Sequence, residues 1–168
     1  MDYEKITRIT DAVMRGLNGD TAKVVTTEET LEFGLDKAKK LISKVQQRAR
    51  EMGLNVVVAV SNEAARPIAV ECMDNAYIAS YDVALNKAFT VVSLKMSTKT
   101  LSTLATPGAS LYGIQYTNDG KIVIFGGGDP LYYKGKIVGG LGVSGGSEQQ
   151  DTELSAYGAS LMDEIMNG

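Results

Sequence analysis

The chain of 168 residues contains no histidine, no tryptophan and a single cysteine, Cys72. The absence of histidine excludes Ser-His-Asp and Cys-His catalysis, the commonest zinc sites and the usual acid–base group at neutral pH. One cysteine cannot form an internal disulfide, which favours a reducing compartment. Catalysis would therefore depend on Asp, Glu, Lys, Tyr or a bound cofactor, and we predict no catalytic residue and no metal site.

Long apolar runs and an excess of positive charge are also missing. No segment approaches the roughly 20 apolar residues of a membrane-spanning helix, and the first residues lack the basic and apolar regions of a signal peptide. Because 17 basic side chains face 20 acidic ones, the net charge gives no general attraction to nucleic acid or to anionic membranes. We expect a cytoplasmic protein with neither as a partner.

The most informative stretch that is present is IVGGLGVSGGSEQQD, residues 137–151. Ile137–Ser144 predicts an interior strand whose glycines let another chain segment, or a flat ligand, lie close to the backbone. Ser147, followed by Gln150, predicts a capping box at the start of a helix that continues to Met166.

Residues 140–145 within this stretch also match the pattern G-x-G-x-x-G. That pattern marks a dinucleotide site only where a second strand with an acidic residue follows the helix. No such strand follows in the given sequence, so we favour glycines that serve packing and turning.

Hydrophobic periodicity predicts the remaining elements. Residues 1–25 are predicted as a helical extension, and residues 26–168 as one domain. The first helix of the domain would start at a Thr26–Glu29 capping box and end at Gly53. Strands are predicted over 54–61, 68–73, 121–125, 131–133 and 136–144, and further helices over 80–94 and 98–105. Because hairpins link neighbouring strands, the fold class is α/β of the α+β type, with about five mainly antiparallel strands.

A series of short motifs runs in order between about Thr27 and Leu161. They are Gly53-Leu54, Met73-Asp74, Ala84, Lys87–Thr90 (KAFT), Gly127–Leu131 (GGDPL), Gly135–Gly145 (GKIVGGLGVSG) and Gln150-Asp151. In these residues the chain resembles the haem-degrading, GlcG/HbpS-like domain (DUF336). This domain also forms the C-terminal part of PduO-type corrinoid adenosyltransferases.

The resemblance implies a profilin-like layered fold with helices on both faces of the sheet, and a homo-oligomer, often an octamer. It also implies a haem, tetrapyrrole or corrinoid-related ligand, in cobalamin-dependent diol or ethanolamine metabolism and its microcompartments. The ATP-dependent transferase domain of the relatives is not part of this sequence, so that activity is not carried over. The cofactor is unknown; haem is possible, but without a histidine its axial ligand would have to come from Met73, Met96, Tyr77, Tyr112 or Tyr116.

Candidate binding residues lie at turns and on the central predicted helix. Asp74 follows a strand and either contacts a ligand or forms an Asx turn. Lys87 could pair with Asp74, hold a ligand carboxylate, or extend its ammonium group to solvent. Ser144 and Gly145 precede a helix N-terminus, which attracts anions. We predict ligand-binding roles for Asp74, Lys87, Gly126, Gly127, Gly128, Pro130, Ser144 and Gly145.

Three functions remain open. The first is a non-enzymatic, oligomeric binding or accessory protein for a haem, tetrapyrrole or corrinoid-related ligand. The second is a structural or assembly partner in microcompartment metabolism with no haem bound. The third is a haem-degrading enzyme with acid–base chemistry from Asp74, Lys87 or a tyrosine.

Overall fold

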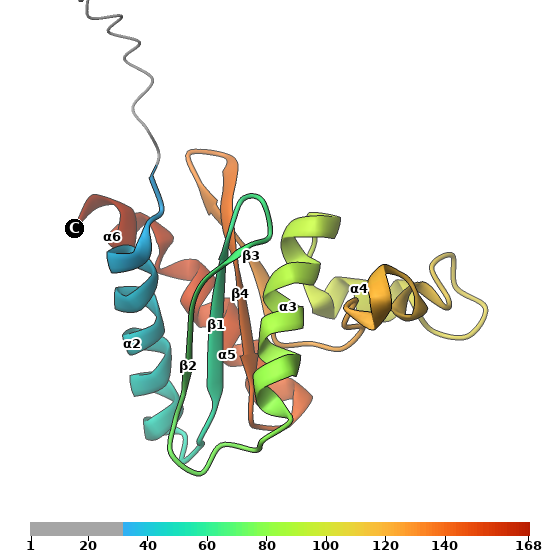
Figure 1. Ribbon diagram of the computed structural model, residues 1–168, viewed down its shortest axis with the longest axis horizontal. Helices are drawn as coiled ribbons and strands as arrows, with labels where there is room; N and C mark the ends of the chain where they lie inside the picture. Colours follow the sequence, from blue (N-terminus) through green and yellow to red (C-terminus); the bar gives the residue numbers. More distant parts are fainter. Residues whose placement is uncertain (1–31) are drawn as a thin grey trace, which may run out of the picture. The chain divides into compact units, whose positions relative to one another are not determined.

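The computed structural model describes residues 32–168, which form an α+β fold around a four-stranded antiparallel sheet (Figure 1). The sheet has the strand order β2-β1-β4-β3. The predicted helix in residues 1–25 and the Thr26–Glu29 box lie outside the described residues. The elements are α2 (Leu35–Glu51), β1 (Val57–Asn62), β2 (Pro67–Cys72), α3 (Ser80–Leu94), α4 (Thr98–Leu104), the short 3-10 helices η1 (Ile114–Tyr116) and η2 (Asn118–Gly120), β3 (Gly128–Tyr133), β4 (Lys136–Ser144), α5 (Glu148–Ser160) and α6 (Met162–Asn167).

Strands β1 and β4 form the interior of the sheet. Val57 of β1 lies opposite Cys72 of β2 on one side and opposite Ser144 of β4 on the other, and both pairings are antiparallel. Strands β3 and β4 form a hairpin whose turn residues, Lys134 and Gly135, both have positive φ, as a two-residue type I′ turn requires. The predictions of an antiparallel sheet and of an interior strand at 137–144 are therefore confirmed.

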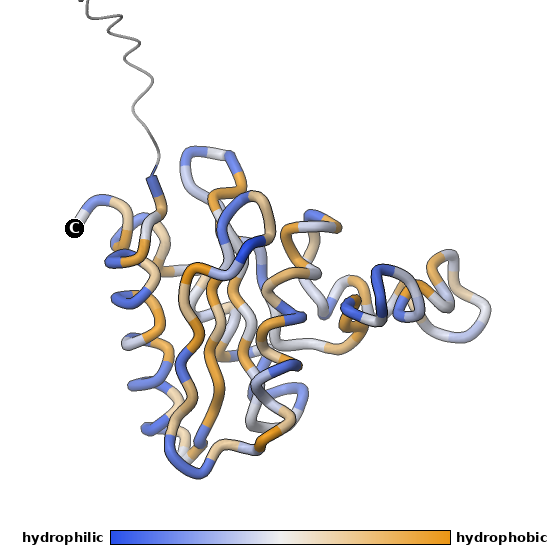
Figure 2. The backbone as a smooth tube through the Cα atoms, in the orientation of Figure 1, coloured by the Kyte–Doolittle hydropathy of each residue, from blue (hydrophilic) through white to orange (hydrophobic). Residues whose placement is uncertain are grey.

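Helices cover both faces of the sheet. Val58 and Val60 of β1 join the larger core cluster, with residues of α2, α5 and α6, whereas Val57 and Ala59 point to the other face and pack on Ala84 and Ala88 of α3. Figure 2 shows that the apolar positions of α2 lie on its sheet-facing side and that the central strands are largely apolar. The burial of these apolar side chains is the main stabilising contribution to such a fold.

Two glycines of β4 let α3 lie directly on the sheet. A Cβ atom added at Gly140 would lie 2.5 Å from the Ala88 carbonyl oxygen, and one at Gly142 would overlap the Ala84 carbonyl oxygen. The neighbour that these glycines admit is thus another segment of the chain. Within residues 32–168 no strand follows α5, so the G-x-G-x-x-G match reflects helix–sheet packing.

The predicted strand at Lys121–Phe125 is wrong, and the described sheet has four strands, not about five. Ile122 and Val123 are buried, so their apolar character does reflect burial. The Val123 N–H, however, donates to Thr90 Oγ1 of α3 at 3.0 Å instead of to a strand. The β3 strand begins earlier than predicted, because Gly128–Pro130 already belong to it.

Two helix boundaries also differ from prediction. Helix α2 begins at Leu35 after the N-cap Gly34, later than the Thr26 start we expected, and it ends before Gly53 as predicted. The Ser147–Gln150 capping box is confirmed. The helix that it starts is interrupted at Leu161, which separates α5 from α6 and whose N–H bonds the Gly158 carbonyl at 3.1 Å.

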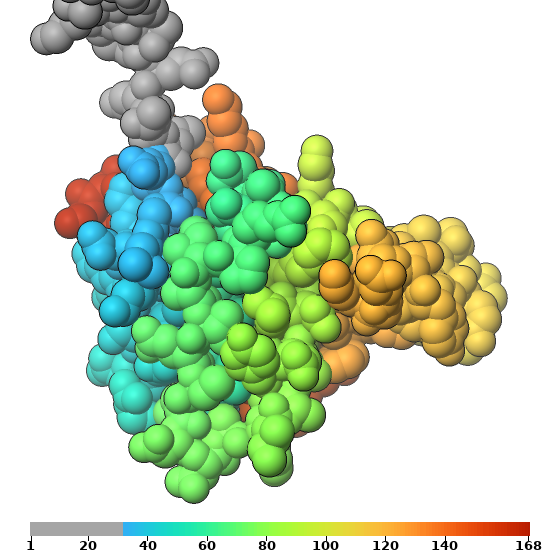
Figure 3. Space-filling view, in the orientation of Figure 1, coloured from blue at the N-terminus to red at the C-terminus, as the bar shows by residue number. Residues whose placement is uncertain are grey.

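The segment from α4 to η2 projects from the sheet and its helices, as the yellow and orange parts of Figures 1 and 3 show. This segment carries the exposed rings of Tyr112 and Tyr116. Among the helices of residues 32–168, none combines the length and the apolar character that crossing a membrane would demand.

Candidate ligand-binding site

Lys87 lies in the middle of α3, and its side chain is fully buried. Its Nζ atom donates to the Val143 carbonyl oxygen at 2.7 Å and to Asp151 Oδ2 at 2.9 Å. The lysine thereby joins α3 to the end of β4 and to the first turn of α5. It neither pairs with Asp74 nor reaches solvent, so both of those expectations are wrong.

Asp151 completes a buried ion pair with Lys87. Its second carboxylate oxygen accepts the Gly146 N–H at 2.9 Å, and the Gly145 N–H also bonds this carboxylate. Burial lowers the pKa of Lys87 and raises the pKa of Asp151, and in each case the charge of the partner opposes the shift. Both shifts favour the uncharged forms, and the pair has no net charge whichever partner holds the proton.

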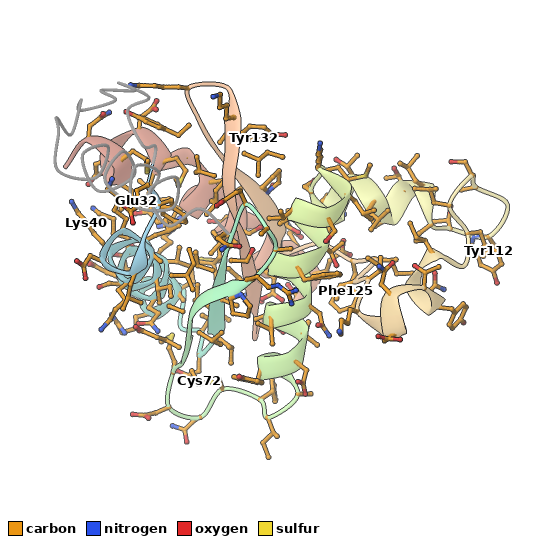
Figure 4. The ribbon with its side chains drawn as sticks, turned by 45° about the horizontal axis from the view of Figure 1, so that its top comes forward. Glu32, Lys40, Cys72, Tyr112, Phe125 and Tyr132 are labelled. Carbon is orange, nitrogen blue, oxygen red and sulfur yellow. The ribbon has the colours of Figure 1, made fainter. Side chains whose placement is uncertain are left out.

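Phe125 and Gly127 cover the ion pair. The Lys87 Nζ lies 4.9 Å from the centre of the Phe125 ring, a cation–π contact, and Figure 4 shows the labelled Phe125 beside α3. A Cβ atom at Gly127 would lie 2.5 Å from that Nζ and 2.7 Å from the Asp151 Cβ, and the φ of Gly127 is +110°. Only glycine combines this backbone conformation with such a close approach.

A pocket of about 300 Å³ adjoins the pair, between the start of α3, the end of β4 and the start of α5. Tyr77 and Phe125 contribute aromatic rings, and Ser144 Oγ donates to Ser80 Oγ at 3.1 Å. This volume is at the lower end for ligand sites, so the pocket can hold a small molecule or one edge of a larger one. Its lining comprises Tyr77, Ala79, Ser80, Val83, Phe125, Ser144, Gly145, Gly146, Glu148 and Asp151.

Four backbone N–H groups beside this pocket have acceptors within the chain. In addition to the two that bond Asp151, the Ser147 N–H donates to Gln150 Oε1 at 2.9 Å and the Gly126 N–H to Glu148 Oε1 at 3.2 Å. Glu148 also pairs with Lys99 at 3.0 Å, and the hydrogen bonds from Lys99 and Gly126 lower the pKa of Glu148. Three of these four groups thus bond the chain's own carboxylates, which take up part of the anion attraction expected at this helix N-terminus.

The predicted binding residues do not form one site. Ser144 and Gly145 line the pocket, and the buried Lys87 lies behind it. Asp74 lines a separate, open and polar pocket of about 590 Å³, and Pro130 lies in the edge strand β3 opposite Gly140. Gly126, Gly127 and Gly128 pack against side chains of α3, α4 and α5.

The sequence analysis did not predict that Phe125, Glu148 and Asp151 line the pocket. Asp151 stands in a motif that carries the family resemblance, but its position in the first turn of a helix suggested only a favourable interaction with the helix dipole. The 64-residue separation between Lys87 and Asp151 leaves no local pattern that would connect them.

Donor atoms for a metal are scarce near the pocket. Within residues 32–168 no group of three or more Cys, Asp or Glu side chains could hold a metal ion. Of the iron ligands considered above, Tyr77 lines the pocket. Met73 lines the other pocket, where its Sδ accepts the Val56 N–H at 3.5 Å. Tyr112 and Tyr116 lie on the projecting segment.

Comparison with known proteins finds a family model and several relatives that match most of this chain. The family model described as "Haem degrading protein HbpS-like" matches residues 33–160. An uncharacterised 15.0 kDa protein from the dhaT-dhaS intergenic region of Citrobacter freundii is 40% identical over 139 residues, which cover 83% of this chain and 98% of that protein. The corrinoid adenosyltransferase PduO of the same organism is 34% identical over 130 residues, or 77% of this chain, but this match spans only 39% of the transferase.

A solved structure agrees with these relatives. The structure titled as a PduOC:haem complex superposes with a TM-score of 0.72 at 34% identity, covering 74% of this chain and 91% of that chain. These matches confirm the resemblance identified from the sequence motifs. Because the family model spans most of the described residues, the chain belongs to the family of HbpS-like haem-degrading proteins.

Proposed function

We propose that this chain is a non-enzymatic binding protein for a planar tetrapyrrole, haem or a corrinoid-related molecule, that assists cobalamin-dependent metabolism. The observation that carries the proposal is the pocket between α3, β4 and α5, which presents the rings of Tyr77 and Phe125 to solvent. The relatives support the ligand class, because one is solved as a haem complex and another is named as a corrinoid enzyme.

The pocket residues fit a macrocycle by contact more than by coordination. Tyr77, Val83 and Phe125 would pack against the ring, and the hydroxyl groups of Ser80 and Ser144 would hydrogen-bond its substituents. For haem, Tyr77 is the pocket residue that would supply an oxygen donor, since the sequence has no histidine. Bound haem would add a planar iron centre whose absorption spectrum reports the contact. The pocket holds one edge of such a ligand, and the exposed Ile78 and Tyr77 extend the surface beside it.

The non-enzymatic part of the proposal rests on the chemistry of the pair behind the pocket. The Lys87 ammonium group directs its donors to Asp151 and to the Val143 carbonyl, and Asp151 accepts from backbone N–H groups as well. A general acid or base must instead face the proton that it transfers.

A homo-oligomer, with an octamer as the expected size, is part of the proposal. The exposed rings of Tyr112 and Tyr116 on the projecting segment are typical of residues that become buried at subunit contacts. The same segment supports a second candidate function, an assembly partner without haem, which the absence of histidine also favours. Light scattering of the purified protein measures the oligomer directly, and a monomer would contradict both ideas.

The binding proposal is tested by titrating the protein with haemin and with cobalamin while recording absorption spectra. We expect a saturable change with at least one of them, weakened about tenfold or more by Phe125→Ala, because a ring that packs on a ligand contributes on the order of 1 kcal/mol or more. Tyr132→Ala is the matched control, since Tyr132 is 48% exposed against 43% for Phe125 but lies in β3 away from the pocket. If neither ligand gives a saturable change, the chain is not a tetrapyrrole-binding protein.

A further inference from the structure

The charges around the pocket between α3, β4 and α5 are arranged in an unusual way for a site that would receive an anion. Among residues 32–168, its lining includes two carboxylates, Glu148 and Asp151, and no basic side chain. Protein sites for carboxylates and phosphates usually present Arg, Lys or free backbone N–H groups. A ligand carboxylate that enters this pocket would approach these two carboxylates directly, whereas the lysines that balance their charge do not line the pocket.

The two lysines nearest the pocket are already engaged. Lys87 is fully buried behind the Phe125 ring, with its donors directed to Val143 and Asp151. Lys99 is exposed and lies 3.0 Å from Glu148. An incoming carboxylate that reached Lys99 would have to share that ammonium group with Glu148 and would therefore lie close to the glutamate carboxylate.

The backbone donors are engaged in the same manner. The N–H groups of Gly145 and Gly146 bond Asp151, and that of Gly126 bonds Glu148. Displacing Asp151 from them would leave a buried carboxylate without its hydrogen bonds, which costs more than an added anion contact returns. Uncharged substituents face no such obstacle, because the Ser80 hydroxyl group accepts from Ser144 and keeps its own proton for an acceptor on the ligand.

We infer that this pocket receives an edge of the macrocycle that carries uncharged groups, such as amides, vinyl or methyl groups, and excludes an edge that carries carboxylates. The inference rests on the proposed function and specifies the chemistry of the ligand within it. A tetrapyrrole with an edge free of carboxylates, or one whose carboxylates are all amidated, can therefore bind. A tetrapyrrole whose propionates alternate with methyl groups around the ring has a propionate at every edge and cannot present an acceptable one.

The test compares ligands that differ in charge alone. Iron coproporphyrin I carries a propionate on each pyrrole ring, in strict alternation with methyl groups so that every edge has one, and its tetra-amide is nearly identical in shape but lacks those charges. Haemin and cobalamin serve as ligands with at least one acceptable edge. In absorption titrations at neutral pH and low salt we expect the tetra-amide to bind at least about tenfold more tightly than the tetra-acid, since like-charge contacts of this kind cost on the order of 1 kcal/mol or more.

Two variants on helix α5 locate the origin of the selectivity. Glu148→Gln removes a carboxylate from the pocket and releases Lys99, so the difference between tetra-acid and tetra-amide should shrink several-fold. Glu153→Gln is the matched control, because Glu153 lies on the same helix and pairs with Arg48 at 3.0 Å but does not line the pocket. We expect this control to keep the full difference.

The outcomes separate the inference from the proposed function. If the tetra-acid binds as tightly as the tetra-amide, or if Glu148→Gln leaves their difference unchanged, the inference is wrong while tetrapyrrole binding stands. If haemin, cobalamin and the tetra-amide all fail to bind saturably, the proposed function fails and the inference fails with it.

Discussion

Two of the ion pairs formed by helix α5 are almost equal in length and very different in setting. Asp151 lies 2.9 Å from Lys87, with side-chain exposures of 5% and 0%, whereas Glu153 lies 3.0 Å from Arg48, with exposures of 53% and 41%. The exposed pair is solvated and contributes little to stability. The buried pair sits where α3, β4 and α5 meet, so any change in its charge must be accommodated by the packing around it.

The largest loss of folding stability is expected from Lys87→Met. This change leaves Asp151 buried with no cation beside it, and we expect a loss of about 3–5 kcal/mol in the free energy of unfolding, as found when one partner of a buried pair is removed. Urea denaturation followed by circular dichroism measures it.

The control for this prediction is the double substitution Lys87→Met with Asp151→Leu. Because it removes both buried charges, most of the lost stability should return. A loss below about 1 kcal/mol for the single variant would show that the pair is not held as the structure indicates.

A smaller loss is expected from Gly127→Ala. The added methyl group would approach the Lys87 Nζ and the Asp151 Cβ, at a φ of +110° that alanine rarely adopts. We expect about 1–3 kcal/mol of destabilisation from overpacking and backbone strain. Gly135→Ala is a useful comparison, because Gly135 also has positive φ (+76°) but has no atom near the added methyl group. Equal losses for the two glycines would mean that the close approach to the ion pair contributes nothing.

The penalty of Lys87→Met should also depend on pH. Burial raises the pKa of Asp151 above its ordinary value of 3.8, and the charge of Lys87 is the largest of the effects that oppose this rise. Without the lysine, the folded variant binds a proton on Asp151 at a higher pH than the unfolded chain does. Between the raised pKa and 3.8, its unfolding free energy should therefore increase as the pH falls.

We thus expect the difference between wild type and Lys87→Met to be largest near neutral pH and to shrink in acid. Urea denaturation of both proteins over a series of pH values measures this trend. A constant difference across the series would indicate that Asp151 does not titrate in the variant.

The smallest effect is expected from Glu153→Gln. The carboxylate that it replaces is solvated and belongs to an exposed pair, so the midpoint of urea unfolding should stay within experimental error of the wild type. Raising the salt concentration should not change the small difference in stability between the variant and the wild type. A clear loss of stability would remove the contrast between the two pairs.

Local patterns were sufficient for much of the fold. The Ser147–Gln150 box, the hairpin between the strands at 131–133 and 136–144, and the apolar strand at 137–144 were predicted correctly, because capping, turn conformation and strand burial depend on neighbouring residues. The strand predicted at 121–125 failed because Thr90, distant in sequence, takes the N–H of Val123.

Local sequence patterns predicted less of the candidate site than of the fold. Of the residues named from the sequence, Ser144 and Gly145 line the pocket and Lys87 lies behind it, but the partner of Lys87 and the position of Phe125 were not predicted. Asp74 and Pro130 were grouped with them and lie elsewhere. Residue type and spacing indicate which side chains can do chemistry, but they do not indicate which of them meet across a sheet.

The sequence by itself determined the family, the antiparallel strand at 137–144 and the glycines that had to lie against something, since these are properties of short segments. Only the tertiary structure showed which segment packs against these glycines. It placed α3 on Gly140 and Gly142, buried Lys87 against Asp151, and directed the N–H groups before α5 to the chain's own carboxylates. The physical reason is that burial and charge pairing arise when segments distant in sequence pack together, and no local pattern records them.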